Sequence, residues 1–346
     1  MAKPTLQSIA EEVGVSRMTV SNAFSRPEKL SAELRERILA VAEERGYVGP
    51  DPAARALARG RTGTVGLLMS GRLGEQASDP VGTEFLVAVA DALSDHGLAL
   101  TLITEGVAGA TIPARDVPLD GAVVYVCDAD SPDLGWLRRR DLPLVTVDQQ
   151  ALPGWPAINV DDRAGARAAA QHVVDLGHRR VGLLNLDPVT GSATLSPTNP
   201  PALARDQGWR DALAAVGIEP LVELAAFMPV TAAYDAALLL LDRPAEERPT
   251  ALLCFSDVFA AQAMRAAESL GLRVPEDLSV VGFDDSSVAT AVSPQLTTVA
   301  QPVTEKGRLA VAALLASRGS DAPAEPVRTV LPTSLVVRGS TAAPPA

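Results

Sequence analysis

Apolar residues in the first 48 positions repeat with the period of an α-helix in three short segments. A hydroxyl residue stands where each helix should begin, because Thr5, Ser16 and Ser31 can accept a hydrogen bond from the first turn. Gly14 and Gly46 stand where the first and third helices should end. The apolar stripes expected to pack together are Leu6, Ile9, Ala10 and Val13, then Val15, Val20 and Phe24, then Leu34, Ile38, Val41 and Ala42. The pattern predicts an all-α domain of three helices over residues 1–48.

The second of these helices carries Arg17, Met18, Ser21 and Asn22 opposite its apolar stripe. Two helices joined by a tight turn and braced by a third are typical of a helix-turn-helix unit, whose second helix lies in the DNA major groove. Arg17 can donate two hydrogen bonds to guanine, Asn22 can pair with adenine, and Met18 can contact a thymine methyl group. The expected phosphate donors are Thr5, Ser16, Thr19, Ser21 and Ser31. The alternative is a small three-helix domain whose polar face has no partner.

Residues 49–62 are predicted to form a linker with one short helix in the stretch AARALARGR. A helix of this length is marginal in water, and Leu57 would be exposed on it. Folding on double-stranded DNA, with Leu57 as an apolar wedge in the minor groove, would cover that side chain. The alternative is an interdomain linker with a helical turn.

From residue 63 to residue 340 the chain alternates short apolar, β-branched runs with helical stripes such as residues 85–97. Strands are predicted at residues 64–70, 98–104, 121–126, 142–148, 179–186, 250–256 and 278–285. This alternation predicts parallel sheets covered by helices on both faces, and the number of strands predicts two similar α/β subdomains. Ligands in such sheets bind at the carboxyl ends of the strands. The residues at these ends are Ser70, Tyr125, Asp148, Ser256 and Asp284.

Charge is distributed unevenly along the chain. The net charge is −12, yet residues 1–62 hold 10 Lys and Arg against 8 Asp and Glu, and the remainder holds 20 against 34. A head that is not acidic on a strongly acidic body is compatible with DNA contact through the head alone. The start of the chain lacks a secretory signal, and no apolar run reaches the roughly 18 residues of a membrane span. We therefore expect a cytoplasmic protein with no membrane partner, with Cys127 and Cys254 as buried thiols.

The head and linker resemble the LacI/GalR family of bacterial transcriptional regulators, through TLQSIAEEVGVSRMTVSNAFS and the A-R-x-L pattern of residues 54–57. In that family, paired linker leucines of a dimer open a central base step of the operator. The resemblance implies a wedge role for Leu57, DNA contact by Arg55, a groove role for the second helix, a homodimer and a pseudo-palindromic operator. Asn22 stands where arginine is common in the family, and YVGPDP has one extra residue before the linker helix. These departures affect the operator preference and the register of the linker helix.

The body resembles the family's effector domain, itself similar to periplasmic sugar-binding proteins, through LGHRRVGLL, GWRDAL, SLGLRVPEDLSVVGFDDS and LTTVAQP. The resemblance implies effector contacts by Arg205, three residues before a Gly-Trp pair, and by Asp284 in GFDD. Asp148 and Phe227 align as further contacts. An arginine and aspartates around an aromatic ring suit a polyhydroxylated ligand such as a sugar. The alternative for any single aspartate is a strand-end cap or turn residue.

The predicted fold is an N-terminal all-α helix-turn-helix head with a hinge helix, followed by an α/β two-subdomain, periplasmic-binding-protein-like effector domain over residues 63–340 and a disordered tail over residues 341–346. The long loops 71–85 and 187–204 are either lids or plain insertions.

The protein is predicted to be a dimeric transcriptional regulator that binds a specific DNA sequence and is controlled by a small-molecule effector. Repression is the preferred interpretation of its role. The chain has no GxGxxG, GxxxxGK[ST], HExxH or GxSxG motif, so no catalytic residue, cofactor or metal site is predicted. Three other functions stay open: a periplasmic-type binding protein without a regulatory role, a constitutive DNA-architectural protein, and a regulator with a nucleoside or purine-like effector.

Overall fold

The computed structural model describes residues 4–69, 78–104, 112–127, 130–187, 199–226, 229–317 and 325–345. The chain divides into two compact units, Met1–Gly63 and Thr64–Ala346, which we call the head and the body. The end of the head lies one residue beyond the predicted end of the linker.

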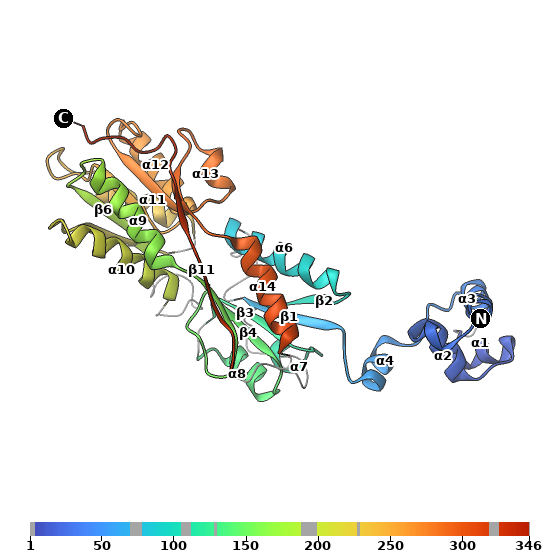
Figure 1. Ribbon diagram of the computed structural model, residues 1–346. Coiled ribbons are helices and arrows are strands. Elements are labelled where there is room, and N and C mark those ends of the chain that lie inside the picture. The colour runs from blue at the N-terminus through green and yellow to red at the C-terminus, as the bar shows by residue number, and fades with distance from the viewer. Residues whose placement is uncertain are drawn as a thin grey trace. The chain divides into compact units, whose positions relative to one another are not determined.

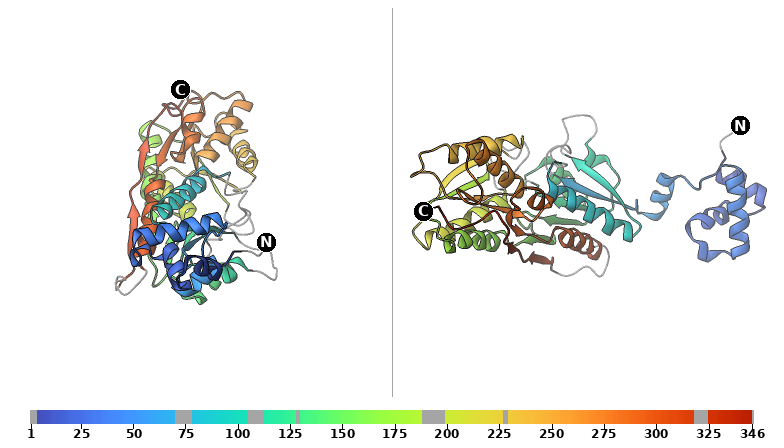
Figure 2. Two further views of the ribbon diagram at one scale, coloured as in Figure 1. Left: turned by 90° about the vertical axis from the view of Figure 1, so that its right-hand side faces the viewer. Right: turned by 90° about the horizontal axis from the view of Figure 1, so that it is seen from above.

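The head contains three packed helices, drawn in blue in Figure 2, and the linker helix. These elements are α1 (Leu6–Val13), α2 (Arg17–Ser25), a 3-10 turn (Pro27–Lys29), α3 (Ala32–Glu44) and the linker helix α4 (Pro52–Arg59). The core of the head consists of Ile9, Ala10, Val13, Val20, Ala23 and Ile38, with Leu6, Val15, Phe24, Leu30, Leu34, Val41 and Tyr47 packed against it. The three predicted helices and their facing stripes are therefore present.

Local capping explains where the helices of the head begin. Thr5, Ser16 and Ser31 each accept a hydrogen bond from a backbone N–H in the first turn of the following helix. Gly14 has a φ of 76°, a left-handed conformation that ends α1. Arg37 Nη2 donates to the carbonyl oxygen of Val13 at 2.7 Å and joins α3 to the end of α1. The predicted caps are confirmed.

The body is built from two lobes, each around one six-stranded sheet (Figure 1). The N-lobe sheet has the order β11-β5-β4-β3-β1-β2 and is entirely parallel. Its strands are β1 (Thr64–Met69), β2 (Ala99–Thr104), β3 (Ala122–Tyr125), β4 (Leu144–Val147), β5 (Ala157–Val160) and β11 (Arg328–Leu331). The C-lobe sheet has the order β12-β10-β9-β8-β6-β7, in which only β12 is antiparallel. Its strands are β6 (Val181–Leu186), β7 (Leu221–Ala225), β8 (Ala251–Cys254), β9 (Ser279–Asp284), β10 (Thr297–Ala300) and β12 (Ser334–Val336).

Helices cover both faces of each sheet, which explains why the central strands are apolar throughout. In the N-lobe, α6 (Pro80–Asp95) and α14 (Val303–Ala316) pack on one face, and α7 (Pro113–Asp116) and α8 (Pro132–Arg139) on the other. In the C-lobe, α9 (Asp162–Asp175) and α10 (Pro200–Ala214) pack on one face, and α11 (Thr231–Leu241) and α12 (Asp257–Ser269) on the other. A short helix, α13 (Ser287–Ala291), follows β9. Cys127 and Cys254 are both buried in these cores, as predicted.

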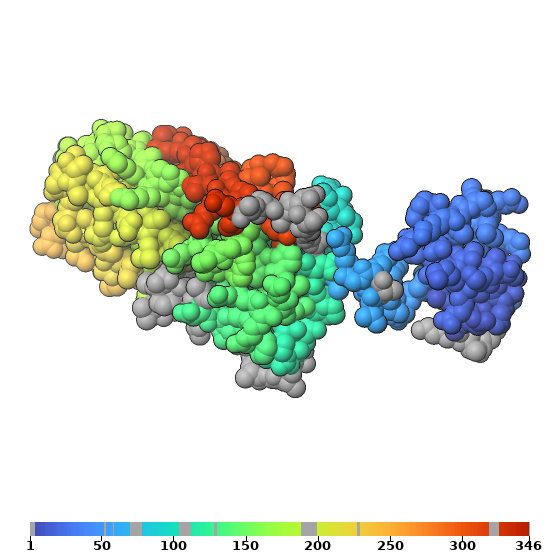
Figure 3. Space-filling model, turned by 60° about the horizontal axis from the view of Figure 1, so that its bottom comes forward, coloured from blue at the N-terminus to red at the C-terminus, as the bar shows by residue number. Residues whose placement is uncertain are grey.

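The chain passes between the lobes three times: after β5, after β10 and after β11. Figure 3 shows the last of these segments, in red, at the surface beside both lobes. The sequence pattern identified seven of the strands but missed β5, β7, β10, β11 and β12. Among the described helices, none is both long and apolar enough to cross a membrane.

The C-terminal tail differs from its prediction. The backbone N–H of Ala342 donates to Ser279 Oγ at 3.0 Å, and the carbonyl oxygen of Ala342 lies 2.9 Å from His178 Nε2. His178 is buried, and its Nδ1 lies 2.8 Å from Thr250 Oγ1. The Oγ1 of Thr341 lies 3.0 Å from His172 Nε2. The prediction of disorder from residue 341 is therefore wrong for Thr341 and Ala342, because buried polar groups of the C-lobe hold them.

Candidate functional site

One side of α2 is built as a polar surface with an exposed apolar side chain. Arg17 is exposed, and 72% of Met18 is exposed, whereas Val20 and Ala23 on the other side of α2 are buried. Asn22 is half-buried. The predicted groove residues therefore combine hydrogen-bond donors with an apolar contact, which is the chemistry that reads base edges.

The phosphate-facing candidates cluster at helix starts. Thr5, Ser16 and Ser31 are exposed and serve as N-caps, while Thr19 and Ser21 are half-buried on α2. A capping hydroxyl accepts from the backbone and keeps its own proton for donation. Ser16 and Thr19 share a hydrogen bond of 2.8 Å between their hydroxyl oxygens.

The linker helix α4 has strong end signals and an exposed leucine. Asp51 accepts hydrogen bonds from the first turn of α4, and Gly60 ends the helix with a φ of 65°. Leu57 is 87% exposed and Arg55 is half-buried. Arg59 Nη2 donates to the carbonyl oxygen of Ser25, at the end of α2, at 3.1 Å. The side chain of Leu57 is therefore accessible to solvent.

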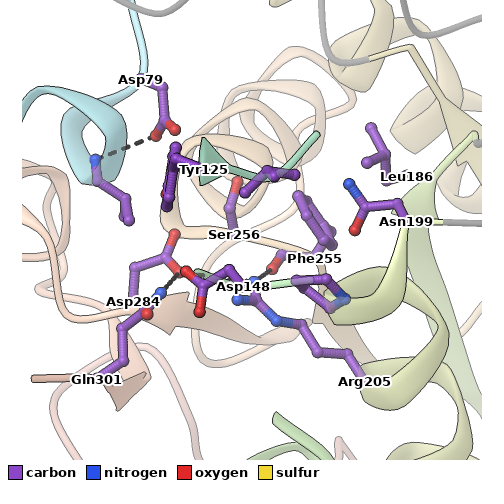
Figure 4. Close-up of a pocket in the computed structure, with 13 residues that line it drawn as sticks. Asp79, Tyr125, Asp148, Leu186, Asn199, Arg205, Phe255, Ser256, Asp284 and Gln301 are labelled. Carbon is purple, nitrogen blue, oxygen red and sulfur yellow. Dashed lines mark hydrogen bonds and ion pairs between the residues drawn. The ribbon is translucent and has the colours of Figure 1, made fainter. Parts of the chain in front are cut away.

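The body contains a cleft lined by residues of both lobes (Figure 4). Its polar lining consists of Asp79, Tyr125, Asp148, Asn199, Arg205, Ser256, Asp284 and Gln301, and its apolar lining of Val81, Val126, Leu186, Pro201 and Phe255. The mixed polar and apolar lining is that of a site for a small ligand. The cleft lies at the carboxyl ends of parallel strands, where open α/β sheets bind ligands.

Three of the lining residues are helix N-caps. Asp79 accepts hydrogen bonds from the first turn of α6, Asn199 from that of α10 and Ser256 from that of α12. Each helix follows a strand whose carboxyl end faces the cleft, so its capping residue lies at the rim of the cleft. Helix starts also bring partly positive N–H groups to this rim.

Arg205, on α10, is the centre of a buried polar cluster. Its Nε donates to Asp162 Oδ1 at 2.8 Å, and its Nη1 donates to the carbonyl oxygen of Phe255 at 2.5 Å and lies 3.5 Å from Asp284 Oδ1. The guanidinium carbon lies 3.6 Å from the ring centre of Phe283 and 4.8 Å from that of Phe255. Charge pairing and ring contacts together fix the position of this guanidinium group.

A glycine permits this placement of Arg205. At Gly208, one turn further along α10, a Cβ atom would stand 2.2 Å from the carbonyl oxygen of Arg163 on α9. Only glycine allows α10 to approach α9 closely enough for Arg205 to reach Asp162. The Gly-Trp pair that follows the arginine in the sequence therefore has a structural role, and Trp209 fills the adjacent core.

A second set of buried bonds joins the two lobes beneath the cleft. Lys306, which is fully buried on α14, donates from Nζ to Asp148 Oδ2 and, at 2.8 Å, to Gln301 Oε1. Gln301 Nε2 in turn donates to Asp284 Oδ1 at 2.7 Å. Asp148 and Asp284 have φ values of 51° and 118°, uncommon for residues other than glycine. Strained backbone of this kind concentrates at functional sites, where it sets the direction of a side chain.

Burial perturbs the acidity of these groups. It raises the pKa of Asp284 well above its usual range, although Arg205 opposes the shift. Burial also raises the pKa of Asp79 and of Asp162, and Arg205 opposes both shifts. Burial, with the neighbouring charge of Asp148, raises the pKa of Tyr125. The shared cause is the burial of these groups around Arg205.

Comparison with known proteins gives the family. Residues 5–49 match the model of bacterial regulatory proteins of the lacI family, and residues 170–341 match that of a periplasmic binding protein-like domain. The HTH-type transcriptional regulator Rv3575c of Mycobacterium tuberculosis is 41% identical over 361 residues, which cover 99% of this chain and 98% of that protein. The chain belongs to the lacI family.

Solved structures of lacI-family proteins agree with this assignment. A lac repressor dimer bound to operator and the anti-inducer ONPF superposes with a TM-score of 0.82 at 26% identity, covering 98% of this chain and 99% of that one. A complex of the transcriptional regulator CelR with cellobiose gives a TM-score of 0.70 at 31% identity, covering 97% and 99%. The protein is therefore a DNA-binding transcriptional regulator of the lacI family and not an enzyme. The predicted fold, a helix-turn-helix head followed by two α/β lobes, is confirmed.

The structure brings five of the seven predicted effector-binding residues of this lacI-family body into one cleft: Tyr125, Asp148, Arg205, Ser256 and Asp284. Ser70 and Phe227 lie outside the described residues, as do residues 71–77 and 188–198 of the two predicted loops. The predicted ends of these loops, at residues 85 and 204, are wrong, because α6 begins at Pro80 and α10 at Pro200. The sequence interpretation missed Asp79, Asn199 and Gln301 in the lining, and the buried partners Asp162 and Lys306. An available signal was the combination Asp-Pro at 79–80 and Asn-Pro at 199–200, since a capping residue before proline typically begins a helix.

Proposed function

We propose that this regulator is a homodimeric repressor that binds a pseudo-palindromic operator and is controlled by a polyhydroxylated effector bound in the cleft of the body. It would act in the cytoplasm, where its DNA target is. The observation that carries the effector class is the lining of the cleft, in which three carboxylates, two amides and a serine hydroxyl stand with two aromatic rings. A ligand with many hydroxyl groups needs paired donors and acceptors in such an arrangement. The relative CelR, solved with cellobiose, supports the same class.

DNA recognition in this proposal belongs to the head. Arg17, Met18 and Asn22 would contact base edges in the major groove, and the capping hydroxyls with Thr19 and Ser21 would contact phosphates. Leu57, beside Arg55, would enter the minor groove as a wedge. A central wedge requires two linker helices side by side, so it requires a dimer. The lac repressor dimer solved on its operator supports this arrangement.

Control follows from linkage between the two ligands. An effector that favours a body geometry incompatible with paired linker helices must weaken DNA binding by the same factor by which DNA weakens effector binding. A coupling of roughly 1–3 kcal/mol, about 5–150-fold in affinity, is typical of such systems. An effector that favours the paired geometry would strengthen DNA binding by the same reasoning.

Selection of bound duplexes from a random pool, followed by sequencing, tests the proposal. We expect an inverted repeat with a central step suited to kinking, and a complex whose mass corresponds to two chains. The enriched operator is then titrated with protein in the presence of neutral sugars and, separately, of nucleosides. A change in affinity with a sugar supports the proposal, and a response to nucleosides alone would replace the effector class. An operator without symmetry, or bound by one chain, would contradict the dimer and the wedge.

A further inference from the structure

Three carboxylate groups face the cleft, and they outnumber its cations. Asp79, Asp148 and Asp284 line it, and Arg205 is the one cation among the lining residues that the structure describes (Figure 4). Lys306 lies directly beneath, with no exposed surface. Whether these two cations can reach an anionic ligand decides which effectors the cleft accepts.

Two of the three nitrogens of the Arg205 guanidinium group are already engaged within the protein. A bidentate pair uses either Nε with one terminal nitrogen or the two terminal nitrogens together. Nε already donates to Asp162 at 2.8 Å, and Nη1 donates to the Phe255 carbonyl at 2.5 Å and lies 3.5 Å from Asp284. Each edge therefore contains one engaged nitrogen, so a bidentate anion would share that nitrogen with Asp162 or with the Phe255 carbonyl.

The ammonium group of Lys306 is also committed. Its Nζ donates to Asp148 Oδ2 and to Gln301 Oε1. An anion in the cleft would have to displace the carboxylate of Asp148 to reach this charge. Lys306 thus pairs with a lining residue from below and is not itself among the lining residues.

One acceptor atom in the cleft is left without a partner in the described part of the chain. The Oδ1 atom of Asp148 is buried and accepts no hydrogen bond, although only 7% of the residue is exposed. A buried carboxylate oxygen without a donor is costly, so this atom favours a ligand that brings one. A hydroxyl or ammonium group can do so, and a deprotonated phosphate oxygen cannot.

We propose that the cleft selects hydroxyl-rich effectors without phosphate or carboxylate groups, so that neutral sugars and their amino derivatives bind and their phosphate esters are rejected. This inference rests on the proposed polyol effector and narrows its class. Asp79 and Asp148 contribute the rejection, because an anionic group beside either carboxylate meets a like charge in a buried site.

The test uses matched sets of sugars with the full-length protein. Glucose, galactose and cellobiose are each titrated calorimetrically, together with the 6-phosphate and the 2-amino derivative of each hexose. We expect the neutral or amino member of a set to bind, and its phosphate ester to bind at least about 100-fold more weakly, as like charges in contact range imply at a protein-like dielectric.

Asp79→Asn tests the electrostatic cause, because asparagine is as good a helix N-cap as aspartate and keeps one of the two oxygens that accept from the first turn of α6. This variant should reduce the ratio of the affinities for the neutral sugar and for its phosphate ester about tenfold. An unchanged affinity ratio would show that Asp79 does not contribute to discrimination against phosphate esters. Glu84→Gln, on the same helix but exposed, is the matched control and should leave the ratio unchanged.

The outcomes separate the inference from the function on which it rests. If a phosphate ester binds as tightly as its neutral sugar, the proposed discrimination against phosphate is wrong, while the proposed polyhydroxylated effector is retained. If no sugar in any form binds to protein that still melts cooperatively and binds its operator, the polyol function fails and the selection fails with it.

Discussion

The substitution Leu57→Ala tests whether the Leu57 side chain acts as a wedge in DNA or as part of the protein core. The side chain is 87% exposed, so the protein itself covers only about an eighth of it. Full burial of a leucine contributes roughly 1.5–3 kcal/mol, so the covered part contributes about 0.2–0.4 kcal/mol. Alanine is also a better helix former than leucine, which offsets part of this loss in α4. The midpoint of thermal unfolding without DNA should therefore fall by no more than about 3 °C.

On the operator the same substitution should be costly. If both linker leucines of a dimer are buried between bases, their removal costs roughly 3–6 kcal/mol, about 10²–10⁴-fold in affinity. Fluorescence anisotropy with a labelled operator measures this loss, and calorimetry of the free protein measures stability. Leu57→Met, which keeps an apolar side chain of similar volume, should bind within a few-fold of the parent. A variant that melts far below the parent, or that binds operator equally well, would refute the wedge.

Three further substitutions test other parts of the molecule. Arg17→Ala should cost roughly 1–3 kcal/mol and relax base preference at one operator position, measured by repeating the duplex selection with the variant; an unchanged profile would remove Arg17 from base reading. Arg205→Met leaves buried carboxylates unpaired and should lower the free energy of unfolding by about 3–5 kcal/mol in urea denaturation. Arg210→Met, in a half-exposed pair on the same helix, should cost less than about 1 kcal/mol. Burial raises the pKa of Asp257 to about 6, so the folded protein holds this proton to higher pH than the unfolded chain. The protonated carboxyl of Asp257 then contributes fully to the free energy of unfolding below about pH 4, and this contribution falls by up to about 3 kcal/mol as pH rises through 6. Asp257→Asn should flatten this decrease in stability, and an unchanged pH profile of stability would contradict the raised pKa of Asp257.

Local signals made the head and the central strands predictable. Caps, glycines and facing stripes all lie within a few residues of the helices they define, so α1, α2 and α3 follow from the sequence alone. The central strands of both sheets are buried on two faces and appear as continuous apolar runs. The same runs located Tyr125, Asp148 and Asp284, because each of these residues stands at the end of one.

The features that were missed depend on partners far away in the sequence. β11 and β12 pair with β5 and β10, and half-exposed edge strands of this kind have the composition of a linker. Lys306 stands in a helix among charged residues, where periodicity predicts solvent exposure, yet its partner Asp148 lies 158 residues earlier. Lys306 is buried because α14 lies very close to α6. At the neighbouring Gly307, a Cβ atom would stand 2.7 Å from the Cβ atom of Ala88 on α6. The packing of α14 on α6, which no local pattern encodes, buries the lysine.

The return of the chain to both lobes near its end has a consequence for synthesis on the ribosome. The core of the head lies within the first 47 residues, so the head can fold as soon as it leaves the exit tunnel. Neither lobe can be completed until the strands after residue 327 have been translated, because one joins each sheet. During most of translation, a nascent chain therefore carries a finished DNA-reading module on an unfinished body. Prematurely terminated chains would share this state, and without a completed body they would meet the operator as single copies with no response to effector.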